Sequence, residues 1–374
     1  MRVIQSRHYT IHSDLPEDFT HELARRMDAM HDEYTRRLTD FRPTGESSRL
    51  QVHLFSRRAD YVALVGADGR QSAGVFIPHR NLLAAVVEGT GRSQFRQVLQ
   101  HEAFHQFAHN RLSPNLPVWL NEGLAELFED GLWTGNGFMI GEAPPWRVAL
   151  LHHHMRQRRL IDFRTIMGWN LSDWNRRIAA GGDEADIQYN QAWAMVHFLV
   201  YATEGTGQPV YRDRLINLLA RLNRSQDAQT AFAAAFSNNI GGFQDRFVAY
   251  ARQLSPTPMT QYMDHVRILA SLLKATGTQD FGTMAQFRSY VRRHWIAPQP
   301  RADGQPVLAA DPMVYFSYRN GQPMADNCLY FIHRSGAPLP DIICEPLDRL
   351  RIRATFYHNP ANEIDFDLVV EPSR

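Results

Sequence analysis

The chain has little cysteine and no long apolar segment, and each absence excludes a class of protein. Its two cysteines, Cys328 and Cys344, form no Cys-x-x-Cys pair, which excludes a disulfide-rich scaffold and a cysteine zinc knuckle. We expect two thiols, and the spacing leaves their pairing open. The longest apolar runs, such as residues 192–200 with a histidine inside, are far shorter than the roughly 18 residues that a membrane span needs. No membrane partner is expected.

The chain also lacks an excess of charge of either sign and an apolar leader. Forty Lys and Arg residues face 39 Asp and Glu residues, so the formal net charge is +1 and no net field would attract nucleic acid or an anionic membrane. Residues 1–6 enter a strand-like pattern without an apolar signal core, from which we expect a cytoplasmic protein. Export of a longer precursor stays open, and nothing in the pattern indicates an oligomeric state.

What is present is a folded chain of several parts. Its 374 residues, 44% hydrophobic and 21% charged, are enough for two or three globular domains. We expect an α+β fold in three parts. Residues 1–90 predict a small mixed α/β sheet layer, residues 91–297 a helical lobe, and residues 298–374 a β-rich domain that follows a Pro- and Gly-containing linker at 298–304.

The periodicity also predicts individual elements in the first and last parts. Apolar residues three and four apart predict helices, and alternation predicts strands. The N-terminal elements are strands at 3–11 and 50–55, a helix at 16–38, and a strand pair at 73–77 and 82–87 across a turn at 78–81. The C-terminal elements are strands at 313–318, 329–333, 349–357 and 364–370.

A short motif inside a predicted helix at residues 93–109 carries the first candidate chemistry. Residues 101–105 read His-Glu-Ala-Phe-His. Positions i and i+4 share a helix face, so His101 and His105 can present two imidazoles to one metal ion, with Glu102 about 100° around the helix beside it. The spacing predicts two zinc ligands and a general base from one helical turn. The alternative is a buried helix that has this pattern by coincidence.

A second predicted helix, which begins near Pro117, supplies carboxylates. Its apolar positions would pack against the first helix and place Glu122 and Glu126 on an adjoining face. A catalytic zinc takes three protein ligands and keeps a fourth position for water, and two His with one Glu is an established set. Glu122 is the predicted third ligand, and we expect Glu126 to accept the free ring N–H of a ligand histidine. The alternative leaves both glutamates on a solvated helix face.

These motifs resemble those of the gluzincin metallopeptidases. That family combines a His-Glu-x-x-His helix with a later helix of the form Asn-Glu-x-x-(Ala/Ser)-(Glu/Asp), which residues 121–126 match as Asn-Glu-Gly-Leu-Ala-Glu. The resemblance implies Zn²⁺ as the cofactor. The site residues that it implies are three zinc ligands, a general base and two supporting residues, namely His101, His105 and Glu122, then Glu102, then Glu126 and Asn121.

A third predicted helix, at whose head Tyr189 lies, resembles an element of the aminopeptidase branch of that family. In that branch a catalytic tyrosine stands at the head of such a helix, so the resemblance implies Tyr189 as the donor to an oxyanion. His197 and Tyr201 on the same helix are the alternative donors. The Gly-x-Met-Glu-Asn motif that anchors substrate in the aminopeptidase branch is absent from this chain, so exopeptidase activity is not implied.

A closer resemblance is to an uncharacterised bacterial peptidase-like family of the same clan, MA. It rests on the N-terminal residues 9–14, the Gly-Val-Phe strand at 74–76 and the helix that carries Tyr189. This resemblance covers residues 1–255 and stops short of the β-rich tail.

With this resemblance, the sequence predicts a zinc-dependent hydrolase that cleaves peptide bonds. Bound zinc would activate a water molecule, and Glu102 would take its proton as the water attacks a peptide carbonyl. The expected partner is a peptide or protein substrate whose sequence the chain does not reveal, with no role for nucleic acid. The alternative is a catalytically silent zinc-binding protein that recognises proteins or glycans through its β-rich part. Hydrolysis at background level with zinc bound would distinguish this alternative.

Overall fold

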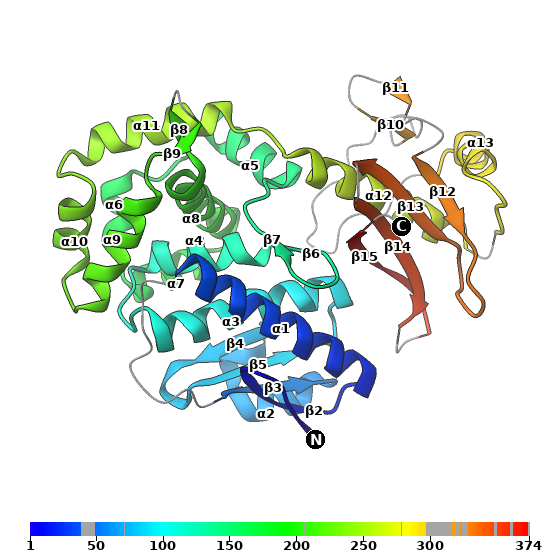
Figure 1. Cartoon of the computed structure of the whole chain (residues 1–374), viewed down its shortest axis with the longest axis horizontal. Coiled ribbons are helices and arrows are strands. Elements are labelled where there is room, and N and C mark those ends of the chain that lie inside the picture. The colour runs from blue at the N-terminus through cyan, green and yellow to red at the C-terminus, as the bar shows by residue number, and fades with distance from the viewer. Residues whose placement is uncertain are drawn as a thin grey trace. The chain divides into compact units, whose positions relative to one another are not determined.

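The computed structural model forms two compact units (Figure 1). It describes residues 1–38, 49–70, 72–204, 207–277, 279–296, 316–318, 322–323, 328–347, 350–359 and 362–372. The first unit comprises residues 1–131 and 136–255, and the second comprises residues 132–135 and 256–374. Helices make up 55% of the structure and strands 18%, which confirms the predicted α+β class with a C-terminal β domain.

The first unit begins with a five-stranded sheet. Its strands are, in spatial order, β1 (Arg2–Gln5), β2 (Tyr9–Ser13), β3 (Leu50–Phe55), β5 (Leu82–Val86) and β4 (Gly74–Ile77). β2, β3 and β5 are mutually parallel, whereas β1 and β4 run antiparallel at the two edges. The predicted strand pair is confirmed as β4 and β5, joined by a 3-10 turn at Pro78–Arg80. The single strand predicted at 3–11 is wrong, because the chain turns back after β1 and the Ser6 N–H bonds the Tyr9 carbonyl.

Two helices accompany this sheet, and one of them connects it to the helical part. They are α1 (Glu17–Arg37) and α2 (Arg58–Val65). The predicted apolar stripe of α1 is buried, namely Leu23, Met27, Met30 and Tyr34. The Tyr34 hydroxyl donates a 2.8 Å hydrogen bond to the backbone carbonyl of Gln100 in α3 (Arg92–Arg111). α1 and α3 are thereby fixed to each other, and α3 in turn contacts β4 and β5.

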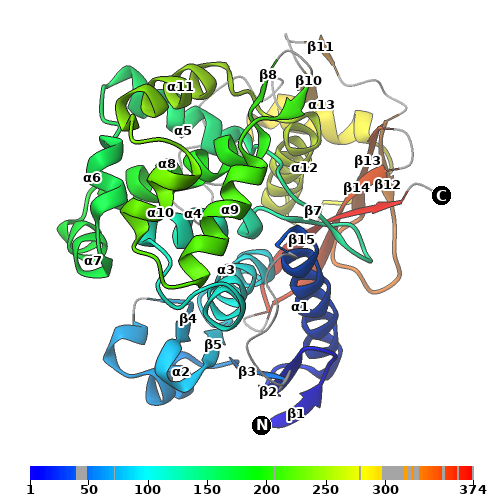
Figure 2. The same cartoon turned by 60° about the vertical axis from the view of Figure 1, so that its left-hand side comes forward.

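The rest of the first unit is helical and is built around one central helix, α8. Its members after α3 are α4 (Val118–Glu129), α5 (Pro145–Arg156), α6 (Phe163–Gly168), α7 (Leu171–Ala180), α8 (Glu184–Tyr201), α9 (Arg212–Asn223), α10 (Ala228–Ala235) and α11 (Ile240–Gln253), with short strands β7 (Phe138–Met139), β8 (Thr203–Glu204) and β9 (Gln208–Pro209). α8 is apolar around most of its circumference, which is typical of a buried helix. It contacts α4, α5, α7, α9 and α11 (Figure 2).

The second unit is a four-stranded antiparallel sheet with helices. Its strands lie in the order β12 (Leu329–Ile332), β13 (Asp341–Leu347), β14 (Leu350–His358) and β15 (Ile364–Pro372). Its other elements are β6 (Leu132–Trp133), α12 (Pro258–Ala275), α13 (Met284–His294), β10 (Ser317–Tyr318) and β11 (Gln322–Pro323). α12 packs on β13, β14 and β15, so its buried residues complete the core of this sheet.

The division between the units differs from the boundary that composition predicts. The sequence places a boundary at residue 297, whereas the compact units divide at 255/256, because α12 and α13 pack on the β sheet. The predicted linker at 298–304 lies outside the described residues. Neither Cys328 nor Cys344 forms a disulfide, and Cys344 is buried in β13. Among the helices that the structure describes, none is long and apolar enough to cross a membrane.

Candidate metal centre

α3 carries the two histidines of the predicted motif on one face. Buried apolar side chains on the other sides of the helix fix which face points to the site, namely Phe95, Leu99, Ala103, Phe104 and Phe107. The imidazoles of His101 and His105 lie side by side, with ring centroids 4.7 Å apart and planes at 79°. Each of these side chains is 13% exposed. The i, i+4 spacing therefore delivers two nearly buried imidazoles to one place.

α4 brings a carboxylate to this pair. The Oε2 atom of Glu122 lies 3.4 Å from Nε2 of His101 and 3.5 Å from Nε2 of His105. The three ligand atoms all lie within 4.8 Å of one another. Tetrahedral zinc with N and O ligands at about 2.0–2.1 Å keeps those atoms about 3.3 Å apart. The two separations that involve Glu122 are therefore those expected around a zinc ion.

The charges in this triad depend strongly on one another. Burial alone would lower the pKa of His101, but the carboxylates of Glu122 and Glu129 outweigh it and raise this pKa well above its usual value. The pKa of His105 is also raised, because the Glu122 charge outweighs burial. Burial would raise the pKa of Glu122, yet the imidazoles hold that pKa below its usual range. Positive charge, as protons or as a cation, is therefore strongly favoured between these side chains.

Glu129 orients His101, a role that the sequence assigned to Glu126. Nδ1 of His101 lies 2.9 Å from Oε2 of Glu129 and 3.7 Å from Oε1 of Glu126. A hydrogen bond from Nδ1–H to Glu129 fixes the tautomer whose Nε2 is free to bind a metal. Sequence reasoning missed Glu129. A signal was available, because Glu129 follows Glu122 by seven residues and seven residues return to the same helix face.

Glu126 is instead paired with a buried arginine on α5. Nη2 of Arg147 donates to Oε2 of Glu126, and its Nε donates to Oδ2 of Asp130, each at 2.5 Å. The guanidinium also lies over the Trp146 ring, 4.4 Å from its centroid. Arg147 is 2% exposed, and a charge so deeply buried needs paired carboxylates. Arg147 therefore holds the last turn of α4 in place, and no local sequence pattern marks it.

The predicted base, Glu102, is fixed by the edge strand β4. Its Oε2 accepts a 2.8 Å hydrogen bond from the backbone N–H of Phe76, and its Oε1 accepts none from the described residues. Gly74 allows this approach, because a Cβ there would lie 2.5 Å from Cγ1 of Val98. The Glu102 charge is among those that raise the pKa of His105 against the effect of burial. Glu102 therefore stands beside the triad with one oxygen unoccupied.

α8 crosses α4 at close range beside Glu122. A Cβ on Gly123 would lie 2.4 Å from the carbonyl oxygen of Ala192 and 2.7 Å from Cγ2 of Val196. Real Cβ atoms do not approach backbone so closely, so this crossing requires glycine. The absence of a side chain at this position brings α8, with Tyr189, against the helix that carries Glu122.

The phenol of Tyr189 lies within electrostatic range of the site. Burial raises its pKa, and the negative charges of Glu122, Glu126 and Glu102 raise it further. The hydroxyl therefore stays protonated at neutral pH and can donate a hydrogen bond. The ring is held edge-on against Trp174, with centroids 5.3 Å apart.

The alternative donors His197 and Tyr201 are committed to other partners. Nδ1 of His197 lies 2.7 Å from the Tyr250 hydroxyl, and Nε2 lies 3.3 Å from the Gly141 carbonyl. Burial lowers the pKa of His197 to about 4. The Tyr201 hydroxyl donates to the Ile140 carbonyl at 3.1 Å. Both residues therefore act in packing between α8 and its neighbours.

A pocket of about 180 Å³ opens beside His105 and Glu122. Its wall comes from the end of β4, from α3, from α4 and from the loop between these two helices, and includes Phe76, Pro78, His109, Leu116 and Asn121. The amide oxygen of Asn121 is buried, with no hydrogen-bond partner in the described part of the chain. Asn121 thus carries an unsatisfied acceptor beside this pocket, and the supporting role beside the metal that the resemblance implies stays a prediction.

Part of the chain matches a known family model. Residues 97–206 match the family model DUF1570, described as a protein of unknown function. The matched span begins one turn before His101 and includes Glu102, Glu122, Glu129 and Tyr189. No curated protein matches the chain.

The bond between His101 and Glu129 leads to a first prediction. Glu129→Gln should weaken zinc binding by about 10–100-fold, because a ligand histidine loses the carboxylate that orients it. Zinc affinity measured by competition with a chromophoric chelator tests this, and circular dichroism verifies the fold. Unchanged affinity would show that the hydrogen bond does not support the ligand.

Proposed function

We propose that the chain is a zinc-dependent peptidase, with His101, His105 and Glu122 as metal ligands and Glu102 as general base. The observation that carries the proposal is the position of Glu122 Oε2, at 3.4 and 3.5 Å from the two imidazole Nε2 atoms. These separations are those of ligand atoms on one tetrahedral zinc. The carboxylate of Glu102 beside them has a free oxygen, as a general base requires.

Each protein group would have one task in the reaction. When bound, zinc supplies a Lewis acid that brings the pKa of a coordinated water to about 7. Glu102 would hold the proton of that water at Oε1, because the Phe76 N–H occupies Oε2 and orients the carboxylate. The same oxygen can then deliver the proton to the leaving amine. Glu129 would keep Nε2 of His101 free through its bond to Nδ1.

Tyr189 is the proposed donor to the oxyanion that forms on the peptide carbonyl. Its burial and its raised pKa keep the proton on the phenol, so the group donates rather than repels the developing negative charge. Two of the carboxylates that raise this pKa are the proposed ligand Glu122 and the proposed base Glu102, which supports a phenol close to the reacting groups.

Tyr189→Phe should therefore lower kcat by about 10²–10³-fold, the usual effect of losing one oxyanion donor, while KM and zinc content change little. Steady-state kinetics on a cleaved peptide measures this. If Tyr189 only packs against Trp174, the Phe variant should turn over substrate as fast as the wild type. That result would show that Tyr189 is not the oxyanion donor.

Digestion of a mixed peptide library by the purified full chain tests the function itself. We expect about one zinc per chain at the triad, cleavage that a chelator abolishes, and recovery on addition of Zn²⁺. Mass spectrometry of the products identifies the cleaved bonds and separates endopeptidase from exopeptidase activity. A zinc-loaded protein that leaves the library intact would contradict the proposal and favour a catalytically silent zinc-binding protein.

A further inference from the structure

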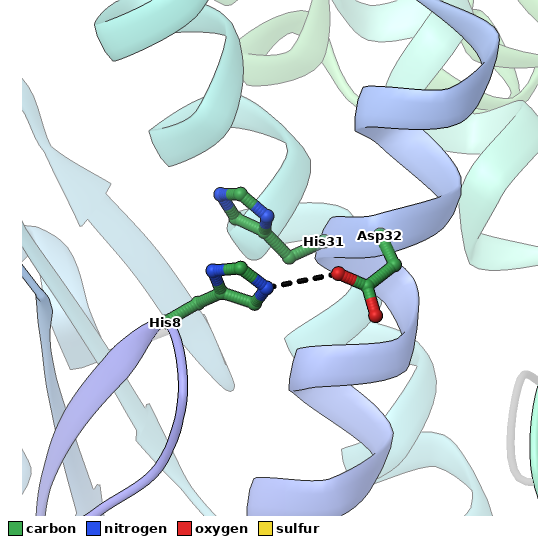
Figure 3. Close-up of side chains that lie close together, drawn as sticks. All are labelled: His8, His31 and Asp32. Atoms are coloured by element: carbon green, nitrogen blue, oxygen red, sulfur yellow. Dashed lines mark hydrogen bonds and ion pairs between the residues drawn. The ribbon is translucent and has the colours of Figure 1, made fainter. Parts of the chain in front are cut away.

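A second group of metal-ligating side chains lies where the turn between β1 and β2 meets α1 (Figure 3). His8 belongs to the turn, and His31 and Asp32 are neighbours on α1. One ligand atom from each lies within 4.8 Å of the other two. Nε2 of His8 is 2.9 Å from Oδ1 of Asp32, and the two imidazoles stack with centroids 3.9 Å apart and planes at 15°, so the partly exposed His8 ring has to tilt for both lone pairs to reach one cation. Figure 3 shows a nitrogen of each ring on the side of the carboxylate.

Asp28, one helical turn before Asp32, holds the turn in position for this group. Its carboxylate accepts hydrogen bonds from the Ser6 hydroxyl at 2.8 Å and from the backbone N–H groups of Arg7 and His8 at 3.0 Å each. The backbone of His8 is thus attached to α1 without use of its imidazole. The imidazole remains available for Asp32 and can tilt toward a shared cation while its backbone stays in place.

His31 has an unsatisfied nitrogen at the same place. The residue is 5% exposed, and Nδ1 has no hydrogen-bond partner among the described residues. Its ring also meets the Phe107 ring edge-on, with centroids 5.2 Å apart, so an apolar group covers one side of it. A buried polar atom without a partner is costly unless a ligand takes its lone pair. A cation shared with His8 and Asp32 would do so.

We propose that His8, His31 and Asp32 form a second metal site, which binds a divalent transition-metal cation and ties the β1–β2 turn to α1. Two imidazoles and one carboxylate suit Zn²⁺, Co²⁺ or Ni²⁺, whereas Mg²⁺ and Ca²⁺ prefer oxygen ligands. On binding, the proton of His8 Nε2 is exchanged through solvent for one on Nδ1, so that the neutral imidazole presents its Nε2 lone pair, and Oδ1 of Asp32 turns from that proton to the cation. Arg7 pairs with the other oxygen of Asp32, at 2.8 Å, and leaves Oδ1 free for this role.

Metal counting on the untagged full chain tests this site. The protein is stripped with a chelator and titrated with Co²⁺, whose visible spectrum reports histidine and carboxylate ligation. His8→Ala and Asp32→Asn should each bind one equivalent less than the wild type. His105→Ala should keep this equivalent, and added Zn²⁺ should raise its Tm, because the metal stabilises the fold that binds it. The double variant His105→Ala with Asp32→Asn should lose this rise.

His12→Ala is the matched control. His12 stacks on His53 in the same sheet, with centroids 4.5 Å apart, but no carboxylate completes a metal-ligating group there among the described residues. This variant should bind as many equivalents as the wild type. The side chains of His8 and Asp32 are 24% and 45% exposed, so their replacement leaves the core intact and either variant decides alone. Equal metal counts in the wild type and in both ligand variants would overturn the proposal.

Discussion

Glu102→Gln is expected to lower kcat for peptide hydrolysis by about 10²–10⁴-fold and to leave the zinc content unchanged. An amide cannot take a proton from the attacking water. Its oxygen can still accept the N–H of Phe76, so the side chain keeps its place between β4 and α3. Turnover of a cleaved peptide and zinc analysis on the same sample measure the two halves of this result.

Glu17→Gln is a suitable control for this variant. Glu17 carries the same charge on α1 but its side chain is 68% exposed, so its replacement should change neither turnover nor zinc. Loss of zinc in the Glu102 variant would mean that this carboxylate holds the metal or the fold. Normal turnover with zinc bound would remove Glu102 from the mechanism.

Glu122→Ala is expected to weaken zinc binding by about 3–4 kcal/mol, or 10²–10³-fold. This figure divides the roughly 10–16 kcal/mol of a four-ligand zinc site among its ligands. Removal of the carboxylate also takes away the main negative charge that raises the pKa of His105 and one of those that raise the pKa of His101 against the effect of burial. Equilibrium dialysis against buffered free zinc measures the loss.

Glu126→Gln separates the third ligand from its neighbour one turn later. Glu126 pairs with Arg147 and lies 3.7 Å from Nδ1 of His101, the nitrogen that faces away from the triad. We expect its replacement to keep zinc and to lower stability, because a buried guanidinium loses part of its partner. If the Glu126 variant loses zinc and the Glu122 variant keeps it, Glu126 is the third ligand and Glu122 is not.

The main features of the site follow from local patterns, and the details depend on distant residues. Helical periodicity at about 100° per residue puts His101 and His105 on one face of α3. On α4 the same periodicity sets Glu129 about 20° and Glu126 about 40° from Glu122, so both could have reached the histidine. Arg147 decides between them by pairing with Glu126. That choice requires the tertiary structure, because Arg147 is 21 residues further along the chain.

The unit boundary was unpredictable for a related reason. α12 has an apolar face, and periodicity predicts that this face is buried but not which core it joins. In the structure it covers β13, β14 and β15, so a helix that precedes the compositional change belongs with the strands that follow it. The ligand group of His8, His31 and Asp32 was also invisible to local reasoning, since its members come from a turn and a helix more than 20 residues apart.

The crossing at Gly123 makes two functional groups depend on one missing methyl group. Residue 123 touches neither metal nor substrate in the proposed mechanism, yet any Cβ there would press on the backbone of Ala192 and push α8 away from α4. Glu122 immediately precedes Gly123 on α4, and Tyr189 lies one turn before Ala192 on α8. The distance between Glu122 and Tyr189 would therefore grow if α8 moved away from α4. A substitution at this glycine would thus act like simultaneous damage to a ligand and to an oxyanion donor, although both side chains would remain.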